Sequence, residues 1–95
     1  IIESLAESAF NTENANLLAA YGWALHSTGD SSGGLEQINH ALELDPQNAR
    51  ALLNQARILL ETDREAEAIP ILERVAQTYT PSGQEAQNLL AILAQ

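Results

Sequence analysis

A repeat of 34 residues constrains this chain more than any other feature of its sequence. When the 95 residues are shifted by this period, the size class of the side chain is kept at almost every apolar position. Gly22 aligns with Ala56 in this register, and Leu25 aligns with Leu59. Further aligned pairs are Leu18 with Leu52, Leu35 with Ile69, Ile38 with Leu72, and Ala41 with Val75. A period of this length predicts one helical hairpin per repeat, with successive hairpins stacked on one another.

Two helices are predicted within the first repeat. Apolar residues at helical spacing place them at about 15–28 and about 33–44. Gly22 lies in the first of these helices, and because it has no Cβ a neighbouring helix can pack close against it. Asp45 followed by Pro46 is typical of a helix N-cap and a first helical position, which predicts that the next helix begins there.

The stretch 28–34 joins these two helices and contains the adjacent glycines Gly33 and Gly34. Glycine at a helix start costs about 1 kcal/mol relative to alanine. We therefore expect this turn to be mobile, or longer than is usual in a repeat.

Residues 15–48 resemble a tetratricopeptide repeat without a gap. The resemblance is carried by Gly22 in the first helix, by Gly29-Asp30 at the turn, and by the ending Ala41-Leu42-Glu43-Leu44-Asp45-Pro46. It implies an all-α fold, a right-handed α-solenoid of stacked antiparallel helix pairs with about six helices.

Residues 49–82 resemble a second copy of the same repeat, with Ala56 and Ala68 at its small positions. Two positions depart from the family pattern. In the first repeat, Gly34 stands where the family usually has alanine. In the second repeat, the terminal proline comes later than in the family pattern, at Pro81. Modules of this family bind many unrelated partners, so the resemblance indicates a fold more sharply than a function.

A single domain, 1–95, is predicted from this pattern. It comprises a leading helix at 1–14, the first repeat at 15–48, the second repeat at 49–82, and a C-terminal capping helix at 83–95. Terminal helices of solenoids cover the exposed end of the last repeat, and we assign that role to the capping helix.

Helix boundaries are predicted from local signals. An apolar stripe over residues 1–10 predicts the leading helix, and the run Asn11–Asn14 is expected to end it. Thr62–Glu65 and Ser82–Glu85 have the capping-box spacing and predict two helix starts. Pro70 falls early in a predicted helix, where it bends the first turn without breaking the helix.

The net charge of the chain limits the classes of partner that it can bind. Thirteen acidic residues against four arginines give a net charge of −9, with no lysine. Such a surface repels nucleic acid and anionic membranes, although most of the acids serve to solvate the helices. The sequence contains no run of 18 apolar residues, so we predict no membrane-spanning helix. The first residue is Ile1 rather than methionine, from which we expect a longer precursor.

The sequence does not predict an enzyme. His26 and His40 lie on different predicted helices, and His40 with Glu43 supplies only half of a metal site. The chain has no cysteine, no nucleophile elbow and no phosphate-binding loop after a strand. We therefore predict no catalytic residue, no metal and no cofactor, and we set a hydrolase or metal enzyme aside.

Partners of the family generally lie in the concave groove that the first helix of each repeat lines. Arg50 and Arg57 are seven residues apart, on one face of such a helix, so half of the basic charge points toward the groove. The implied partner is a protein or peptide with a carboxylate or an apolar anchor. The implied peptide-binding positions are Asn16, Ala19, Trp23, His26, Arg50, Leu53, Asn54 and Arg57, together with Ser27, Leu60 and Glu61.

An alternative reading of the same residues is structural. Trp23 is then only a packing residue between helices, and the arginines pair with local acids such as Glu61. One subtype of the family is set aside, the co-chaperones that clamp a C-terminal Glu-Glu-Val-Asp peptide. Their lysine and asparagine are replaced here by Ala19 and Trp23.

Residues 15–95 also resemble the C-terminal repeat region of bacterial cytochrome c maturation factors. The matching motifs are Gly33-Gly34, Leu44-Asp45-Pro46, Ala68-Ile69 with Leu72-Glu73-Arg74, Pro81-Ser82-Gly83-Gln84-Glu85, and the stretch 86–94. This resemblance implies an adaptor in cytochrome c assembly, and a periplasmic location rather than a cytoplasmic one. The alternative function is a self-association module, in which the terminal helices build a homo-oligomeric scaffold.

Overall fold

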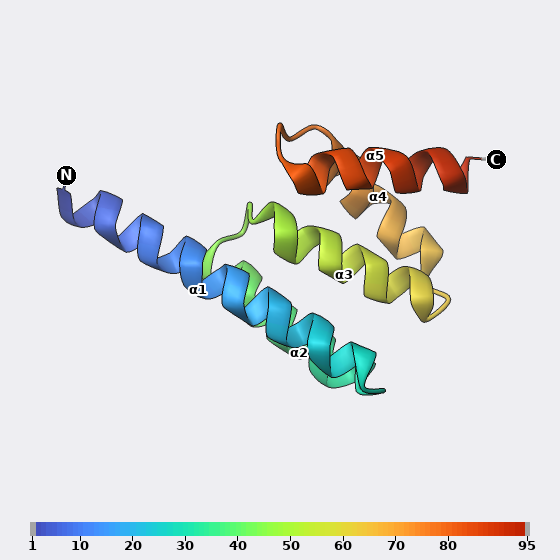
Figure 1. Ribbon diagram of the computed structural model, residues 1–95, viewed down its shortest axis with the longest axis horizontal. Coiled ribbons are helices and arrows are strands. Elements are labelled where there is room, and N and C mark those ends of the chain that lie inside the picture. Colours follow the sequence, from blue (N-terminus) through green and yellow to red (C-terminus); the bar gives the residue numbers. More distant parts are fainter. Residues whose placement is uncertain (1, 95) are drawn as a thin grey trace.

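The computed structural model describes the backbone of residues 2–94 and the side chains of residues 11–94. Within these residues the chain is all-helical, as predicted. The molecule measures 47 × 29 × 17 Å (Figure 1). Its helices are α1 (Ile2–Ser27), α2 (Ser31–Leu44), α3 (Ala49–Glu61), α4 (Glu65–Ala76) and α5 (Pro81–Leu93).

The helices form stacked pairs. α1 packs on α2 and α3 packs on α4, while α5 packs on both α4 and α3. In Figure 1, α1, α3 and α5 follow one another across the molecule, with α2 behind α1 and α4 behind α5. The solenoid of helix pairs predicted from the sequence is therefore confirmed. No helix of the described residues is long and apolar enough to cross a membrane.

α1 is one continuous helix where two were predicted. The run Asn11–Asn14 does not end it, so residues 2–94 contain five helices rather than about six. Asparagine and threonine each cost at most about 0.7 kcal/mol in a helix, glutamate is a good helix former, and the run contains no glycine or proline that would break a helix. The predicted apolar stripe at 1–10 falls on side chains outside the described part of the chain.

The turn between α1 and α2 is short, so the prediction of a long turn is wrong. Only residues 28–30 separate the two helices. Gly29 takes a positive φ of 103°, and the Asp30 side chain caps α2 by accepting a hydrogen bond of 2.9 Å from the Gly33 amide. Gly33 and Gly34 lie inside the first turn of α2, and Gly34 is buried against α1.

Asn48, rather than Asp45, is the N-cap of α3. Its side chain accepts a hydrogen bond of 2.9 Å from the Ala51 amide, whereas Asp45 caps the end of α2 through its own amide. Asn48 is also held in place by Asn16, whose side-chain oxygen accepts a hydrogen bond of 2.9 Å from it. The tertiary contact with α1 thus fixes the capping residue, and the helix starts later than Asp45-Pro46 predicts.

Neither predicted capping box forms. The Thr62 hydroxyl donates to the Ile58 carbonyl at the end of α3, so it does not cap α4. The N-cap of α5 is Thr80, followed by Pro81 at the first helical position, and not Ser82. Proline fits that position because its missing amide would have had no partner there. α4 continues through Pro70, as predicted.

The interior consists of two apolar clusters that share α3. The first cluster lies among α1, α2 and α3, and the second lies among α3, α4 and α5. Small side chains dominate the first, which lets the helices approach closely. The first cluster comprises Ala15, Ala19, Ile38, Ala41, Ala51 and Ile58, and the second Leu52, Leu53, Ala56, Leu59, Ala68, Leu72, Val75 and Ala86.

Candidate peptide-binding groove

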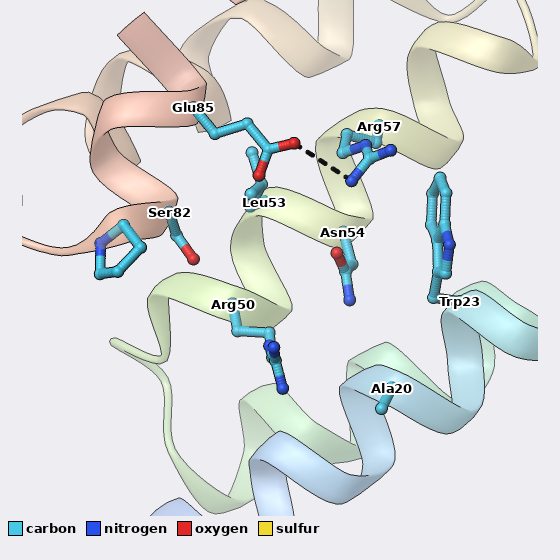
Figure 2. A pocket seen from close by; sticks show the side chains of 9 residues that line it. Ala20, Trp23, Arg50, Leu53, Asn54, Arg57, Ser82 and Glu85 are labelled. Atoms are coloured by element: carbon cyan, nitrogen blue, oxygen red, sulfur yellow. Dashed lines mark hydrogen bonds and ion pairs between the residues drawn. The ribbon is translucent and has the colours of Figure 1, made fainter.

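A cavity of about 340 Å³ opens between α1, α3 and α5. We call it the α1–α3–α5 groove. Figure 2 shows α1 along one wall, α5 along the other, and the side chains of α3 between them. Its size lies within the range of known ligand pockets. The lining residues are Ala20 and Trp23 from α1, Arg50, Leu53, Asn54 and Arg57 from α3, and Pro81, Ser82 and Glu85 from α5.

Trp23 and Arg57 form the central contact of the groove. The Arg57 guanidinium carbon lies 4.2 Å from the centre of the Trp23 ring, which is a cation–π geometry. Trp23 also packs against the first apolar cluster. The packing role that the sequence left open is therefore present, and in addition the ring supports the arginine beside the groove.

Arg57 pairs with Glu85, which was expected to be part of a capping box and not the partner of an arginine. Its Nη1 lies 3.4 Å from a Glu85 carboxylate oxygen, across the groove from α3 to α5 (Figure 2). Both side chains are partly exposed, so this ion pair stabilises the fold only weakly. Glu61, the alternative partner named from the sequence, pairs with His26 and not with an arginine.

Arg50 differs from Arg57 because it is exposed and has no acidic partner among the described side chains. It lies where the groove meets a second cavity of about 480 Å³. The two cavities also share Pro81 and Ser82, so they form one continuous surface. The second cavity extends along α1 to Asn16 and Thr12.

The structure brings five of the eleven predicted positions together in the groove, namely Trp23, Arg50, Leu53, Asn54 and Arg57, whereas Ser27, Leu60 and Glu61 are not among its lining residues. Asn16 lines the adjoining cavity. Ala19 is buried in the first apolar cluster, where its carbonyl accepts a hydrogen bond of 3.2 Å from Asn54. Its neighbour Ala20 supplies the exposed surface at that point of the groove.

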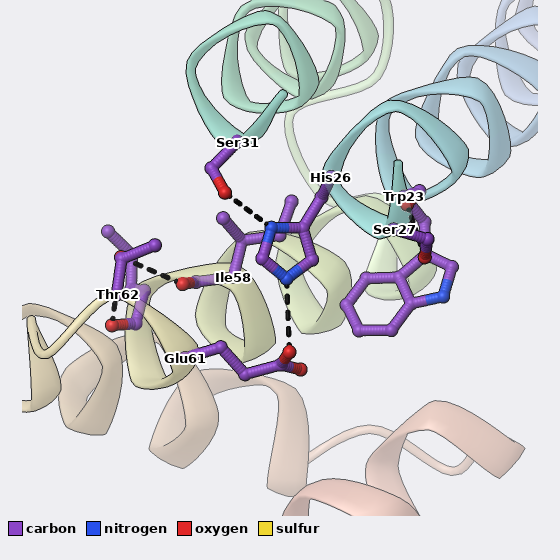
Figure 3. A network of polar contacts seen from close by, with 8 residues as sticks. Trp23, His26, Ser27, Ser31, Ile58, Glu61 and Thr62 are labelled. Atoms are coloured by element: carbon purple, nitrogen blue, oxygen red, sulfur yellow. Dashed lines mark hydrogen bonds and ion pairs between the residues drawn. The ribbon is translucent and has the colours of Figure 1, made fainter. Parts of the chain in front are cut away.

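His26 belongs to a polar bridge outside the groove lining. Its Nδ1 lies 2.7 Å from the Ser31 hydroxyl and its Nε2 lies 3.1 Å from a Glu61 carboxylate oxygen, as Figure 3 shows. A carboxylate only accepts hydrogen bonds, so Nε2 carries a proton; when the ring is neutral, Nδ1 accepts from Ser31. The histidine thus ties α1 to α2 and α3, with its ring 5.3 Å from that of Trp23.

The contribution of α5 to the groove was missed at the sequence level. Residues 83–95 were assigned only as a cover for the second repeat, yet Pro81, Ser82 and Glu85 line one wall. The 34-residue period gave no signal for it, because Leu52 and Ala56 shifted by a further 34 residues fall on Ala86 and Leu90, which reverses the side-chain sizes. Ala86 is buried in the second cluster, so α5 takes the place of a first helix of a third repeat.

No metal site accompanies the groove. Within the described residues, no group of three or more histidine, aspartate or glutamate side chains could hold a metal ion. His40 is exposed on α2, a helix that supplies none of the groove-lining residues.

Two sequence models described as tetratricopeptide repeat match the chain, one over residues 35–93 and the other over residues 15–48. The first of these covers more than half of the chain. The chain belongs to the tetratricopeptide repeat family. The match at 15–48 spans the same residues as the first predicted repeat. The match at 35–93 includes all of α5 and so agrees with a third repeat-like helix.

Membership of the tetratricopeptide repeat family makes this chain a protein–protein interaction module, and such modules are typically non-catalytic. The search of curated proteins and the search of solved structures found no match.

Proposed function

We propose that the α1–α3–α5 groove binds a segment of a partner protein that presents a carboxylate. The observation that carries this proposal is the distribution of positive charge. In a chain of net charge −9, two of the four arginines line one groove, and Arg50 has no acidic partner among the described side chains. A cation without an internal partner, at the junction of two cavities, is suited to an anionic group of a ligand.

Trp23 provides the second part of the binding surface. Tryptophan and arginine are the residues that most often dominate the binding free energy of interfaces. Here the ring holds Arg57 in place before the partner arrives, which reduces the side-chain entropy lost on binding. Pro81 and the small exposed part of Leu53 add apolar surface elsewhere in the groove lining, which suits an apolar anchor of the same partner.

The resemblance to cytochrome c maturation factors supports a narrower form of this proposal. In that form the module is an adaptor of a bacterial assembly complex, located in the periplasm, and its partner is another component of that complex. Nothing in the groove is specific to haem chemistry, so the narrower form depends on the sequence resemblance alone.

A second candidate function is self-association. Leu17 and Tyr21 are one turn apart on α1 and are 69% and 53% exposed, and Ile92 on α5 is 65% exposed. Large exposed apolar side chains at both ends of a solenoid are suited to stacking of one copy on the next.

Two measurements distinguish partner binding from self-association. They are the capture of a partner protein by the immobilised domain and the native mass of the domain. We expect the native mass to stay that of a monomer when the protein concentration is raised about 100-fold. We also expect the domain to capture a partner protein, with capture lost in Arg57→Ala and retained in Glu36→Gln. Glu36 is exposed on α2 and provides the control of a charge change outside the groove. A mass that rises with concentration, with capture insensitive to Arg57→Ala, supports the scaffold instead.

A further inference from the structure

We infer that Glu85 fills a carboxylate site on Arg57 in the free protein, and that the carboxylate of a partner replaces it on binding. This inference rests on the proposed function and adds to it the position at which the partner's acid binds. It also assigns Glu85 as a residue that sets the affinity for acidic segments.

The geometry of the contact between Glu85 and Arg57 is that of a weak interaction that another carboxylate can replace. Glu85 reaches Arg57 from the opposite wall of the groove and makes one contact of 3.4 Å, to Nη1. A guanidinium has five N–H donors and binds a carboxylate most strongly through two parallel hydrogen bonds. Among the described residues no other acceptor is bonded to Arg57, so a better-placed carboxylate has donors available to it.

Arg57 does not need Glu85 to keep its position. The stacking on Trp23 holds the guanidinium from its face, whereas Glu85 contacts it at one edge. Replacement of Glu85 therefore leaves the arginine supported. The ring contact and a new carboxylate contact can exist at the same time.

Replacement of Glu85 requires no movement of α5. The helix is anchored beside this residue by Ala86, which is fully buried in the second cluster, and by Gly83, which packs directly on the backbone carbonyl of Thr78. The Glu85 side chain is half exposed and extends from this fixed backbone. It can turn into solvent by rotation about its own bonds, which occurs much faster than helix displacement.

Two pentapeptides test this inference, both acetylated and amidated so that they carry no terminal charge. One is leucine-alanine-glutamate-alanine-leucine, and the other has glutamine in place of glutamate. Trp23 is the only tryptophan of the chain and lies in the groove, so its fluorescence reports binding directly. The side-chain N–H signal of Arg57 in a nitrogen-15 NMR spectrum provides a second readout at the proposed site.

For the glutamate peptide, we expect Glu85→Gln to bind about two- to fivefold more tightly than the natural protein, the range typical of an exposed ion pair. The glutamine peptide should show no such gain. Glu36→Gln makes the same charge change on α2 and should leave the affinity within about 1.5-fold. On an Arg57→Gln background the gain from Glu85→Gln should disappear.

Failure of this inference differs from failure of the proposed function. If the glutamate peptide binds, is weakened by Arg57→Gln, and is unaffected by Glu85→Gln, then Glu85 does not compete and only this inference is overturned. An equal gain with Glu36→Gln also overturns it, because the effect is then one of net charge. If neither peptide changes the Trp23 or Arg57 signals in any variant, the groove takes no carboxylate and both proposals are overturned.

Discussion

Gly22 and Gly34 face each other where α1 crosses α2, and each occupies space that a side chain on the other helix would need. A Cβ on Gly22 would lie 2.6 Å from the Gly34 carbonyl oxygen, and a Cβ on Gly34 would lie 2.5 Å from the Gly22 carbonyl oxygen. The two backbones are therefore in contact. This explains why a second glycine stands where the family pattern has alanine, since alanine at Gly34 would push the helices apart.

The close crossing predicts that Gly22→Val destabilises the fold. We expect a loss of at least about 1 kcal/mol of unfolding free energy, because the obstacle is backbone and cannot move aside as a side chain does. Thermal unfolding followed by circular dichroism should show a drop in Tm of about 4 °C or more. Ala24→Val, at an exposed position of the same helix, is the control and should change Tm little. Equal melting of the two variants would contradict the close crossing.

Ala56 tests the register of the repeat. It is fully buried in α3 and aligns with Gly22, so the larger side chain in Ala56→Leu has no space. Overpacking of this kind costs about 1–3 kcal/mol. Ala66→Leu, at an exposed position of α4, is the matched control. An unchanged Tm for Ala56→Leu would mean that the small positions of the two repeats have been misaligned.

Substitution of Trp23 or Arg57 tests whether the captured partner binds in the groove. Loss of an interface hot spot costs about 2 kcal/mol or more, so Trp23→Ala and Arg57→Ala should each weaken binding at least about 30-fold. The effect of Arg57→Ala should diminish as salt is raised, because a partly exposed charge is screened. Circular dichroism must show that both variants remain folded, since Trp23 also packs on the first cluster.

Substitutions outside the groove provide the controls for this series. Glu36→Gln and His40→Ala lie at exposed positions of α2 and should leave affinity unchanged. Were these two variants to abolish binding while the groove variants bind normally, the partner would lie on another face of the solenoid.

The polar bridge of His26 should contribute to stability rather than to binding. The side chain is only 10% exposed and makes two hydrogen bonds, to Ser31 and Glu61. His26→Ala should therefore lower the free energy of unfolding by about 1–3 kcal/mol in chemical denaturation. His40→Ala removes an exposed histidine and should change it by less than about 0.5 kcal/mol. Similar losses in both variants would show that the bridge does not hold the helices together.

The ion pair between Glu67 and Arg64 predicts that part of the stability of α4 depends on pH. The Arg64 guanidinium donates hydrogen bonds of 2.6 and 2.9 Å to the Glu67 carboxylate, which lowers the pKa of Glu67 below its ordinary value. The pair therefore stabilises the fold above the pKa of an unfolded glutamate, and this contribution is lost as pH falls through the lowered pKa. In a carbon-13 NMR titration, Arg64→Ala should raise the pKa of Glu67. An identical titration midpoint in both proteins would contradict the pairing.

The helical hairpins and their period could be predicted from the order of the residues alone. The size class of the side chain repeats at many apolar positions, and the small residues Gly22 and Ala56 both fall in the packed interior between helices. These features follow from helical spacing and from side-chain volume, which are local properties of the chain. For the same reason the placement of Arg50 and Arg57 on one face of α3 could be predicted, since both lie on one helix.

The contacts between residues of different helices could not be predicted and became known from the three-dimensional packing. It paired Arg57 with Glu85 and His26 with Glu61, contacts that join residues 28 and 35 positions apart. It also joined Asn48, the cap of α3, to Asn16 on α1. Such contacts depend on the angle and distance at which helices cross. Those are set by the packing of many side chains together, so no short stretch of sequence contains them.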